Sequence, residues 1–375
     1  MLIQIHILQN YAPANLNRDD TGSPKDAIFG GLRRGRISSQ CLKRSIRRST
    51  TFAEYFSSTN LLGMRTRLLP QQIKEALVDL QVPQPVIDAI VSRVPEIGRE
   101  SAKGESNTES QEGNDEVVVV QTRQLIFIGA NEIKPLAQKL LEIFNQHGVD
   151  KWKKAKIADI TKELGASLPK SVDIAMFGRM TTSEAFEDVQ ASVQVAHAIS
   201  TNALTEEFDY YTAVDDLSGE TGAGMIGDVE FNSSTYYKYL NIHWEQLVKN
   251  LAGDKEIAKQ AVKALIKAAT IAHPTGKQNS FAAFNLPDLV LVEVSESNLP
   301  VSYANAFLKP VRSNHQSSIM DISMDQLASH MDQLIKTYDL SSQRAFITTT
   351  EHPFQSAQQQ TNVNTLIDWA VGFLA

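Results

Sequence analysis

The sequence has 375 residues, of which 42% are hydrophobic and 21% are charged, and its formal net charge is −7. This composition is typical of a folded globular protein with one large domain and insertions, or with two to three smaller units. The single cysteine excludes an intrachain disulfide, and no apolar run reaches the roughly 20 residues of a membrane span. The first residues lack the charged start and cleavage site of a signal peptide, so we expect a cytoplasmic protein with no membrane contact.

The N-terminal segment predicts a strand, a loop and a helix. Ile3, Ile5 and Ile7 alternate with polar residues, which predicts a strand with one buried face. Residues 9–35 contain Asn, Asp, Gly and Pro with little periodicity and predict a long loop. A helix should follow, with Ser38 or Ser39 as its N-cap.

This loop and helix concentrate positive charge. Between Arg18 and Arg48 there are nine Lys or Arg and three acidic residues, about +6 in a chain of net negative charge. Phosphate is the usual partner of such a concentration. The first helical turn offers amides and a partial positive charge, and Lys43 and Arg47 lie on one face with Gln40. Such contacts hold the backbone of a nucleic acid without reading its base sequence. A solvated basic helix, or a surface for an acidic protein partner, would explain the same pattern.

The next part of the chain is mostly helical in pattern. Spaced apolar positions predict helices at 70–82, 85–94, 131–147 and 150–165. Residues 96–116 have seven acids, two basic residues and few apolar side chains, which predicts a mobile acidic loop. Residues 117–120 and 125–128 are strands or buried helical turns, because periodicity cannot separate the two.

Strand patterns return in the second half. We expect strands at 172–177, 191–199, 208–214, 235–242, 289–294 and 346–350, and helices at 244–251, 254–272 and 363–374. A strand, a helix, a long helical insertion and further strands indicate an α+β sheet domain interrupted by an insertion.

A glycine-rich hairpin is expected between 208 and 231. Its arms, 208–214 and 229–231, flank a loop with four glycines and an apolar pair, Met225 and Ile226. Such a tip can dock on a neighbouring protein or act as a wedge between stacked bases.

Catalytic and cofactor signals are weak. The eight histidines are scattered and Cys41 has no cysteine partner, so neither a metal nor a cofactor is expected. Cys41 itself is expected to be a small buried residue. Asp19, Asp20 and Asp26 could hold a divalent ion and cleave RNA, or could pair with nearby basic residues and cap turns.

Several ordered blocks resemble one protein family. The segments 16–20, 24–31 and 33–44, then 172–180, 196–199, 212–217 and 276–285, closely resemble the CasC family, the backbone subunits of type I-E CRISPR Cascade complexes. The resemblance spans nearly the whole chain, is weak after about Ser313 and does not extend to 96–116. Cys41 departs from the family, where a small polar residue is commoner.

The resemblance implies a hand-like architecture. It implies an RRM-like (ferredoxin-like) palm at 1–52, 191–203 and 235–375. A helical fingers insertion would occupy 53–190, and a β-hairpin thumb 204–234.

The resemblance also implies function and partners. Copies would stack head to tail along a crRNA and present its spacer to target DNA, with the thumb kinking the guide at intervals. Further partners would be the crRNA-processing endoribonuclease and the large, small and tail subunits. Type I subunits are not nucleases, so no catalytic residue is expected; the alternative is a metal-dependent ribonuclease of the type III kind using Asp26 or Asp19 and Asp20. The implied RNA-binding residues are Arg18, Lys25, Ser38, Ser39, Gln40, Lys43, Arg47, Arg179, Met180, Lys277 and Gln278, with Met225 and Ile226 as the thumb wedge.

Overall fold

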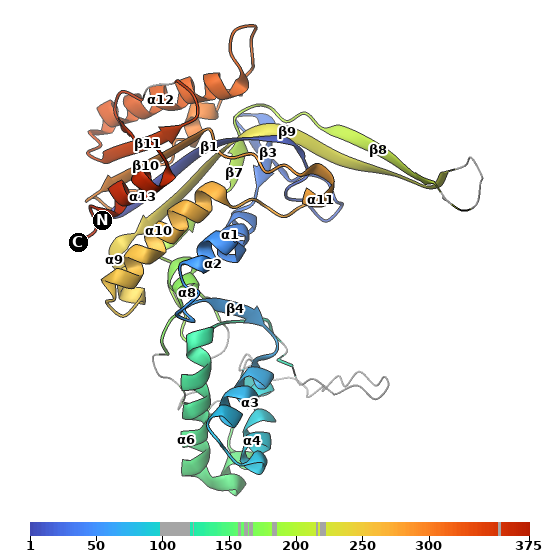
Figure 1. The fold of residues 1–375 in the computed structure, drawn as a ribbon, viewed down its shortest axis with the longest axis vertical. Helices are drawn as coiled ribbons and strands as arrows, with labels where there is room; N and C mark the ends of the chain where they lie inside the picture. The colour runs from blue at the N-terminus through green and yellow to red at the C-terminus, as the bar shows by residue number, and fades with distance from the viewer. Residues whose placement is uncertain are drawn as a thin grey trace. The chain divides into compact units, whose positions relative to one another are not determined.

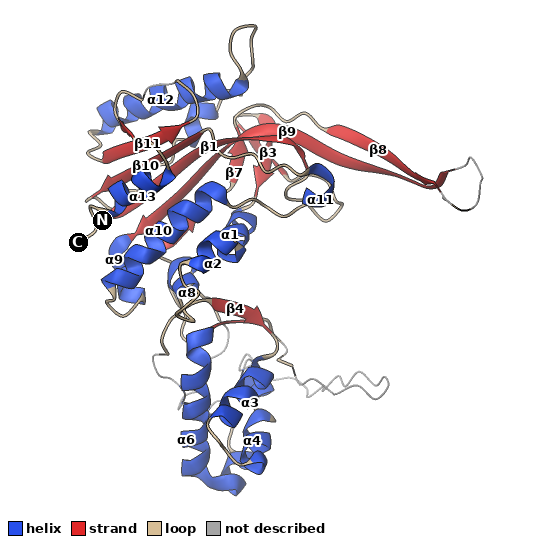
Figure 2. Cartoon of the chain, viewed as in Figure 1, coloured by secondary structure: helices blue, strands red, loops and turns tan. Residues whose placement is uncertain are grey.

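The computed structural model describes residues 1–97, 121–122, 124–156, 159–160, 164, 168–181, 186–214, 217, 223–351 and 354–375. These residues form two compact units. The first contains Met1–Tyr55, Val193–Glu245 and Lys259–Ala375, and the second contains Phe56–Ser192 and Gln246–Ala258. The fold is a mixture of helices and strands, which confirms the α+β class (Figure 2).

A ten-stranded sheet is the framework of the first unit. Its main path runs β12-β11-β10-β1-β9-β7-β3-β2, with β6 and β8 also paired to β9 (Figure 1). The central strand β1 pairs antiparallel with β9 and β10, so that Ile5 lies opposite Leu240 and Val292. The strands are β1 (Leu2–Ala14), β2 (Asp26–Phe29), β3 (Leu32–Ile37), β6 (Val193–Val195), β7 (Ala198–Ser200), β8 (Glu207–Val214), β9 (Ala223–His243), β10 (Leu289–Ser295), β11 (Gln343–Thr348) and β12 (Gln358–Gln359).

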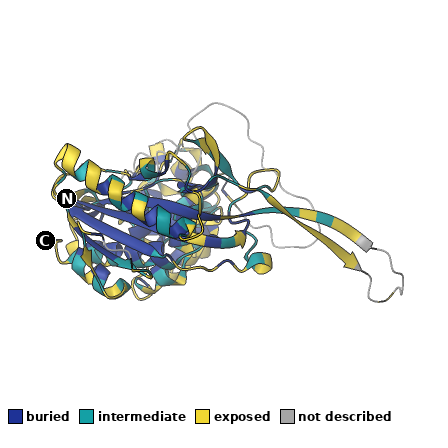
Figure 3. Ribbon diagram, turned by 90° about the horizontal axis from the view of Figure 1, so that it is seen from above, coloured by how far each residue is buried: buried dark blue, intermediate teal, exposed yellow. Residues whose placement is uncertain are grey.

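Helices cover both faces of this sheet. On one face, Leu8 and Leu291 pack in a core with Met324 and Leu327 of α12. Neighbouring strand residues such as Ile7 point to the other face, because side chains alternate along a strand. Figure 3 shows the central strands of this sheet as buried. The helices of the first unit are α1 (Ser39–Arg48), α2 (Thr50–Glu54), α10 (Lys255–Ile271, which begins in the second unit), α11 (Gln278–Phe281), η1 (Ala304–Phe307), α12 (Ile319–Tyr338) and α13 (Val363–Val371).

Strands β8 and β9 extend beyond the sheet as a hairpin. Their pairing runs from Glu207 opposite Phe231 to Val214 opposite Ala223, with a register shift near the end. Figure 3 shows this hairpin as largely exposed, in contrast to the buried strands beside it.

The second unit is helical around its own core. Leu69, Ile73, Leu140 and Trp152 are among its buried residues. A two-stranded sheet of β4 and β5 closes one end and pairs Gly63 with Gly129. Its elements are β4 (Gly63–Thr66), α3 (Leu69–Asp79), α4 (Gln84–Val91), α5 (Val94–Ile97), β5 (Ile126–Gly129), α6 (Ala130–Lys154), α8 (Val172–Phe177) and most of α9 (Trp244–Asn250).

Two predictions for the N-terminal half are wrong. Residues 9–35 are not one loop, because β1 continues to Ala14 and β2 pairs with β3 in a hairpin. Its turn uses Gly30 and Gly31, whose φ angles of 62° and 81° favour glycine. Residues 172–177 form helix α8, not a strand. Five of its six residues are buried, so no period distinguished the two structures.

Other predictions are confirmed or lie outside the described residues. Residues 125–128 resolve as strand β5, whereas 98–116 of the predicted acidic loop, and 117–120, lie outside the described residues. The predicted helix 131–147 and the first residues of the predicted helix 150–165 fall in the single element α6, which is broken at Gly148, where φ is 72°, and ends at Lys154. In the described part of the chain, no helix combines the length and apolar character that crossing a membrane requires.

Candidate nucleic-acid interface

Helix α1 begins where its sequence predicts. Ser38 has extended backbone angles, and its hydroxyl accepts a hydrogen bond from the Cys41 amide at 3.3 Å, which is the geometry of an N-cap. Leu42 and Ile46 are buried, as their spacing predicts. Cys41 is only half-buried, so the prediction of a buried residue holds in part. Ser38 itself is 6% exposed, which gives it a structural role at the helix start.

Hydrogen bonds fix the basic loop against this helix start. The Asn17 carboxamide oxygen accepts from the Ser38 amide at 2.8 Å, and the Lys25 amide donates to the Asn17 carbonyl at 2.8 Å. The Arg36 amide in turn donates to the Lys25 carbonyl at 2.8 Å. The backbones that carry Lys25 and Arg36 are therefore held beside the first turn of α1, and both residues line one small hollow.

The 276–278 turn packs on the same loop. A Cβ added to Gly276 would lie 2.3 Å from the Leu16 carbonyl oxygen, so only glycine allows this approach. Lys277 follows with a φ of 50° and is half-buried. The side chain of Gln278 stabilises this turn, since its Nε2 donates to the carbonyls of Pro274 at 3.0 Å and Ala283 at 3.3 Å.

Several cations of this region have no acidic partner. Among the described residues, Arg18, Lys25 and Lys43 form no ion pair. Burial lowers the pKa of Lys43. At the helix start, partial burial lowers the pKa of His197, and the charges of Arg36 and Lys25 lower it further. A polyanion such as a nucleic acid can neutralise positive charges that have no counterion within the protein.

Two other arginines are engaged within the fold. Arg33 pairs with Asp26 and with Glu206, both at 2.5 Å. Arg34 is fully buried, and its guanidinium donates to the carbonyls of Ser200 and Thr201 at 2.9 Å and of Phe307 at 2.7 Å. These residues anchor the β2–β3 hairpin.

The acidic residues of the loop are arranged as structural groups. One carboxylate oxygen of Asp19 accepts from the Thr21 hydroxyl at 2.8 Å and from the amides of Thr21 and Ser23, and these bonds lower its pKa, the hydroxyl most. Asp26 is bound to Arg33, and Asp20 is exposed. Within the described residues, no three His, Cys, Asp or Glu side chains gather as a metal site would need.

Several predicted residues of the first unit belong to helix α1 and to the loop held beside its start. Arg18 and Gln40 are exposed, and Lys25, Ser39, Lys43 and Arg47 are half-buried. We call this set the α1 surface: Arg18, Lys25, Ser39, Gln40, Lys43 and Arg47. Sequence reasoning missed Asn17, Arg36 and His197, which hold the surface together. Arg36 and His197 are brought together by the pairing of β3 with β7, and Asn17 acts through its bond to the Ser38 amide; no local pattern encodes these contacts.

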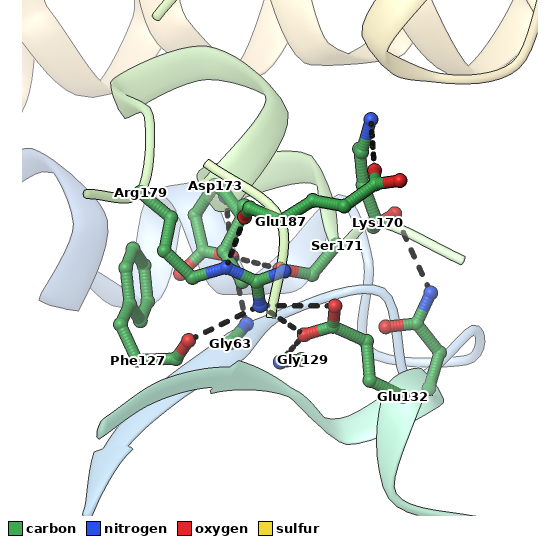
Figure 4. A network of polar contacts seen from close by, with 11 residues as sticks. Gly63, Phe127, Gly129, Glu132, Lys170, Ser171, Asp173, Arg179 and Glu187 are labelled. Carbon is green, nitrogen blue, oxygen red and sulfur yellow. Dashed lines mark hydrogen bonds and ion pairs between the residues drawn. The ribbon is translucent and has the colours of Figure 1, made fainter. Parts of the chain in front are cut away.

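Arg179 and Met180 belong to the second unit. Arg179 is 6% exposed and pairs with the buried Glu132 at 2.9 Å, within a network that includes Phe127 and Glu187 (Figure 4). Glu132 has its pKa raised by burial, which the guanidinium opposes. The Arg179 guanidinium is therefore held inside the second unit, whereas the adjacent Met180 is 93% exposed.

Met225 and Ile226 lie within strand β9 of the hairpin. Met225 pairs with Ala213 and Ile226 with Thr212, and both are more than half exposed. Adjacent residues of a strand project to opposite faces, so the two cannot act on the same surface together.

Comparisons with known proteins give a consistent result. The family model described as CT1975-like protein matches residues 3–370. One solved chain, from a CRISPR RNA-guided surveillance complex, pre-nicking, has a TM-score of 0.82 at 28% identity over 100% of both chains. A second, from a CRISPR RNA-guided surveillance complex, has a TM-score of 0.72 at 24% identity over 99% of both chains and supports the fold alone. No curated protein gives a significant match.

Proposed function

The chain belongs to the CT1975-like protein family, and from this premise we propose that it is a non-catalytic backbone subunit of a CRISPR Cascade complex. The subunit holds the sugar–phosphate backbone of a guide RNA without reading its sequence. We further propose type I-E, with the palm, fingers and thumb divided as the sequence resemblance implies. The partners are the guide, target DNA through the guide, other copies of the chain and the remaining Cascade subunits.

The α1 surface is the observation that carries this proposal. Among the described residues, its cations Arg18, Lys25 and Lys43 form no ion pair, and they belong to helix α1 and to the loop that is held against its start. A helix start binds phosphates through its backbone amides, and lysine and arginine side chains near it bind phosphates through their charge. Neither kind of contact reads the bases. The solved chain of 28% identity comes from an RNA-guided complex, which supports the same assignment.

The distribution of charge supports self-assembly. Residues 206–231 contain eight acidic and no basic residues, whereas 18–48 carry about +6. Opposite charges on separate segments of one chain favour a head-to-tail contact between copies. Such a contact does not close on itself and builds a filament along the guide.

Salt-dependent binding to RNA tests the proposal. In K43A/R47A we expect weaker binding of a labelled single-stranded RNA, and a salt dependence flatter by ~0.7 log unit for each phosphate that the variant no longer neutralises. The control R44A/R48A removes the same charge from the exposed side of the same helix and should have a smaller effect. Unchanged affinity and slope in K43A/R47A would refute the proposal.

Two assays address the alternatives. Assembled complex is incubated with labelled complementary RNA and Mg²⁺ or Mn²⁺; we expect intact RNA, since Asp19 and Asp26 are held in structural bonds. Regular cuts that D26A abolishes would establish the ribonuclease instead. An acidic protein partner in place of RNA would leave the purified protein with a low ratio of absorbance at 260 to 280 nm.

A further inference from the structure

His197 stands beside the α1 surface because of how the sheet is paired. It lies between β6 and β7, and β7 pairs with β3 so that Ile37 is opposite Ala198. Since β3 leads directly into the N-cap of α1, this register places His197 at the first helical turn. The imidazole is exposed, unlike that of a core histidine.

The contacts of His197 fix its tautomer. Its Nδ1 accepts from the Ser39 amide at 3.3 Å and lies 3.4 Å from Nη1 of Arg36. An amide and a guanidinium can only donate, so Nδ1 must be the unprotonated nitrogen. The proton of the neutral ring is therefore on Nε2, which has no hydrogen-bond partner among the described residues.

Both edges of the ring can serve a bound strand. The Nδ1 edge orients the Arg36 guanidinium and occupies the Ser39 amide, while Ser38 already caps the amide of Cys41. The amide of Gln40, between them, has no partner in the described part of the chain. The Nε2 edge presents one neutral donor to solvent, close enough to Lys25 for that charge to act on the ring.

We propose that His197 is a positioning residue for RNA binding that also contacts the strand itself. Nδ1 sets the direction of the Arg36 guanidinium and the first turn of α1, and Nε2–H donates to a phosphodiester oxygen. The ligand class is a single-stranded polynucleotide backbone, and the inference rests on the proposed function. The contribution of a neutral donor is independent of salt, unlike that of the lysines around it.

Three substitutions separate the two edges. H197A removes both nitrogens, and we expect affinity for a labelled single-stranded RNA to fall about tenfold, as for one hydrogen bond to a charged group together with poorer positioning of Arg36. H197N keeps a polar atom near the place of Nδ1, and H197Q keeps a donor near that of Nε2. Each should recover part of the affinity, and all three should keep the wild-type salt slope, because Nε of Arg36 still donates to the Asp26 carbonyl at 2.9 Å and its charge stays beside the strand.

The outcomes distinguish this inference from the proposed function. Wild-type affinity in H197A, with weak binding in K43A/R47A, would overturn the role of His197 and leave the function standing. Wild-type affinity in both would overturn the proposed function itself. No rescue by H197N or H197Q, or a flatter salt slope in H197A, would also contradict the inference. Thermal unfolding of each variant checks that the fold is intact.

Discussion

Lys238 shows how one residue can couple the fold to pH. It lies on β9 and is 2% exposed, and its ammonium donates to the Gln9 carboxamide and, at 3.1 Å, to the Tyr11 hydroxyl. Neither partner is a carboxylate, so the charge is not neutralised. Burial lowers the pKa of Lys238 to about 7 from an unfolded value of 10.5.

This pKa predicts the sign of a pH effect. Between pH 7 and 10.5 the unfolded chain binds a proton at Lys238 that the folded chain does not, so the free energy of unfolding rises with pH. The destabilising contribution is complete below pH 7 and disappears as pH approaches 10.5. Its slope is about 1.4 kcal/mol per pH unit.

K238M removes this linkage. We expect the variant to be more stable than wild type at pH 6, and this advantage to shrink steadily between about pH 7 and 10. Denaturant unfolding of both proteins at several pH values measures the difference between their free energies of unfolding. The titration of all other groups cancels in this difference. K238R, which remains charged, is the matched control: it should lose stability relative to wild type over the same pH range, and its difference from K238M should stay constant with pH. A constant difference between wild type and K238M across pH would contradict a buried, titrating lysine.

Single residues also show where sequence reasoning ends. The three- and four-residue spacing of Gln40, Lys43 and Arg47 correctly identified a face of α1 distinct from that of the buried Leu42 and Ile46. Arg179 follows a glycine in a recognisable block and was expected to contact RNA. Its partner Glu132 is 47 residues away in sequence, so burial of the pair could not be predicted.

At the scale of elements, local pattern predicted long amphipathic segments and missed short or fully buried ones. Helix α3, with one buried stripe, was predicted nearly to its ends. Helix α8 was not, because burial on all sides erases the period. The β2–β3 hairpin was missed because its strands carry the charged residues Arg33, Arg34 and Arg36, which obscure any alternation. Only the pairing of β2 with β3 in the structure reveals this hairpin.

The β8–β9 hairpin makes a sharper prediction about its own faces. Ile226 shares a face with Phe208 and Tyr210, all between 64% and 65% exposed. Met225 shares the other face with Tyr211. The Tyr211 ring lies over Gly227, since a Cβ added to Gly227 would come within 2.6 Å of that ring. The Ile226 face therefore presents more apolar surface for wedging between bases.

Fluorescence of 2-aminopurine in the guide measures this preference, since the base brightens when it is unstacked. We expect I226S to lower the signal of an assembled filament and M225S to leave it nearly unchanged. Both substitutions exchange an exposed apolar side chain for the same residue, so they control for each other. Equal decreases in both variants would mean that the strand does not present a single face to the guide.

At the scale of the whole molecule, the net charge of −7 conceals two opposite segments. A basic segment around α1 and an acidic hairpin cannot both be explained by affinity for RNA, because the hairpin repels phosphate. The acidic side chains Asp209, Asp228 and Glu230 are exposed or half-buried on the hairpin. The α1 surface of a second copy of the chain is a basic partner that the acidic hairpin could contact.

Charge reversal on the hairpin separates binding from assembly. We expect D209K/D228K/E230K to bind single-stranded RNA at least as well as wild type, because the change removes repulsion, but to lose cooperative assembly on a long RNA. Sedimentation velocity at increasing RNA length measures both, and higher salt should weaken wild-type assembly in the same way.

A control with three equal reversals elsewhere, E142K/D150K/E296K, changes net charge by the same amount at exposed positions outside the hairpin. If total charge governed association, both triple variants would assemble equally poorly. If the hairpin contact governs it, only D209K/D228K/E230K fails, and it fails while single copies still bind RNA. Normal assembly by that variant would exclude an electrostatic contact through the hairpin, because reversing three charges turns any attraction to a basic surface into repulsion.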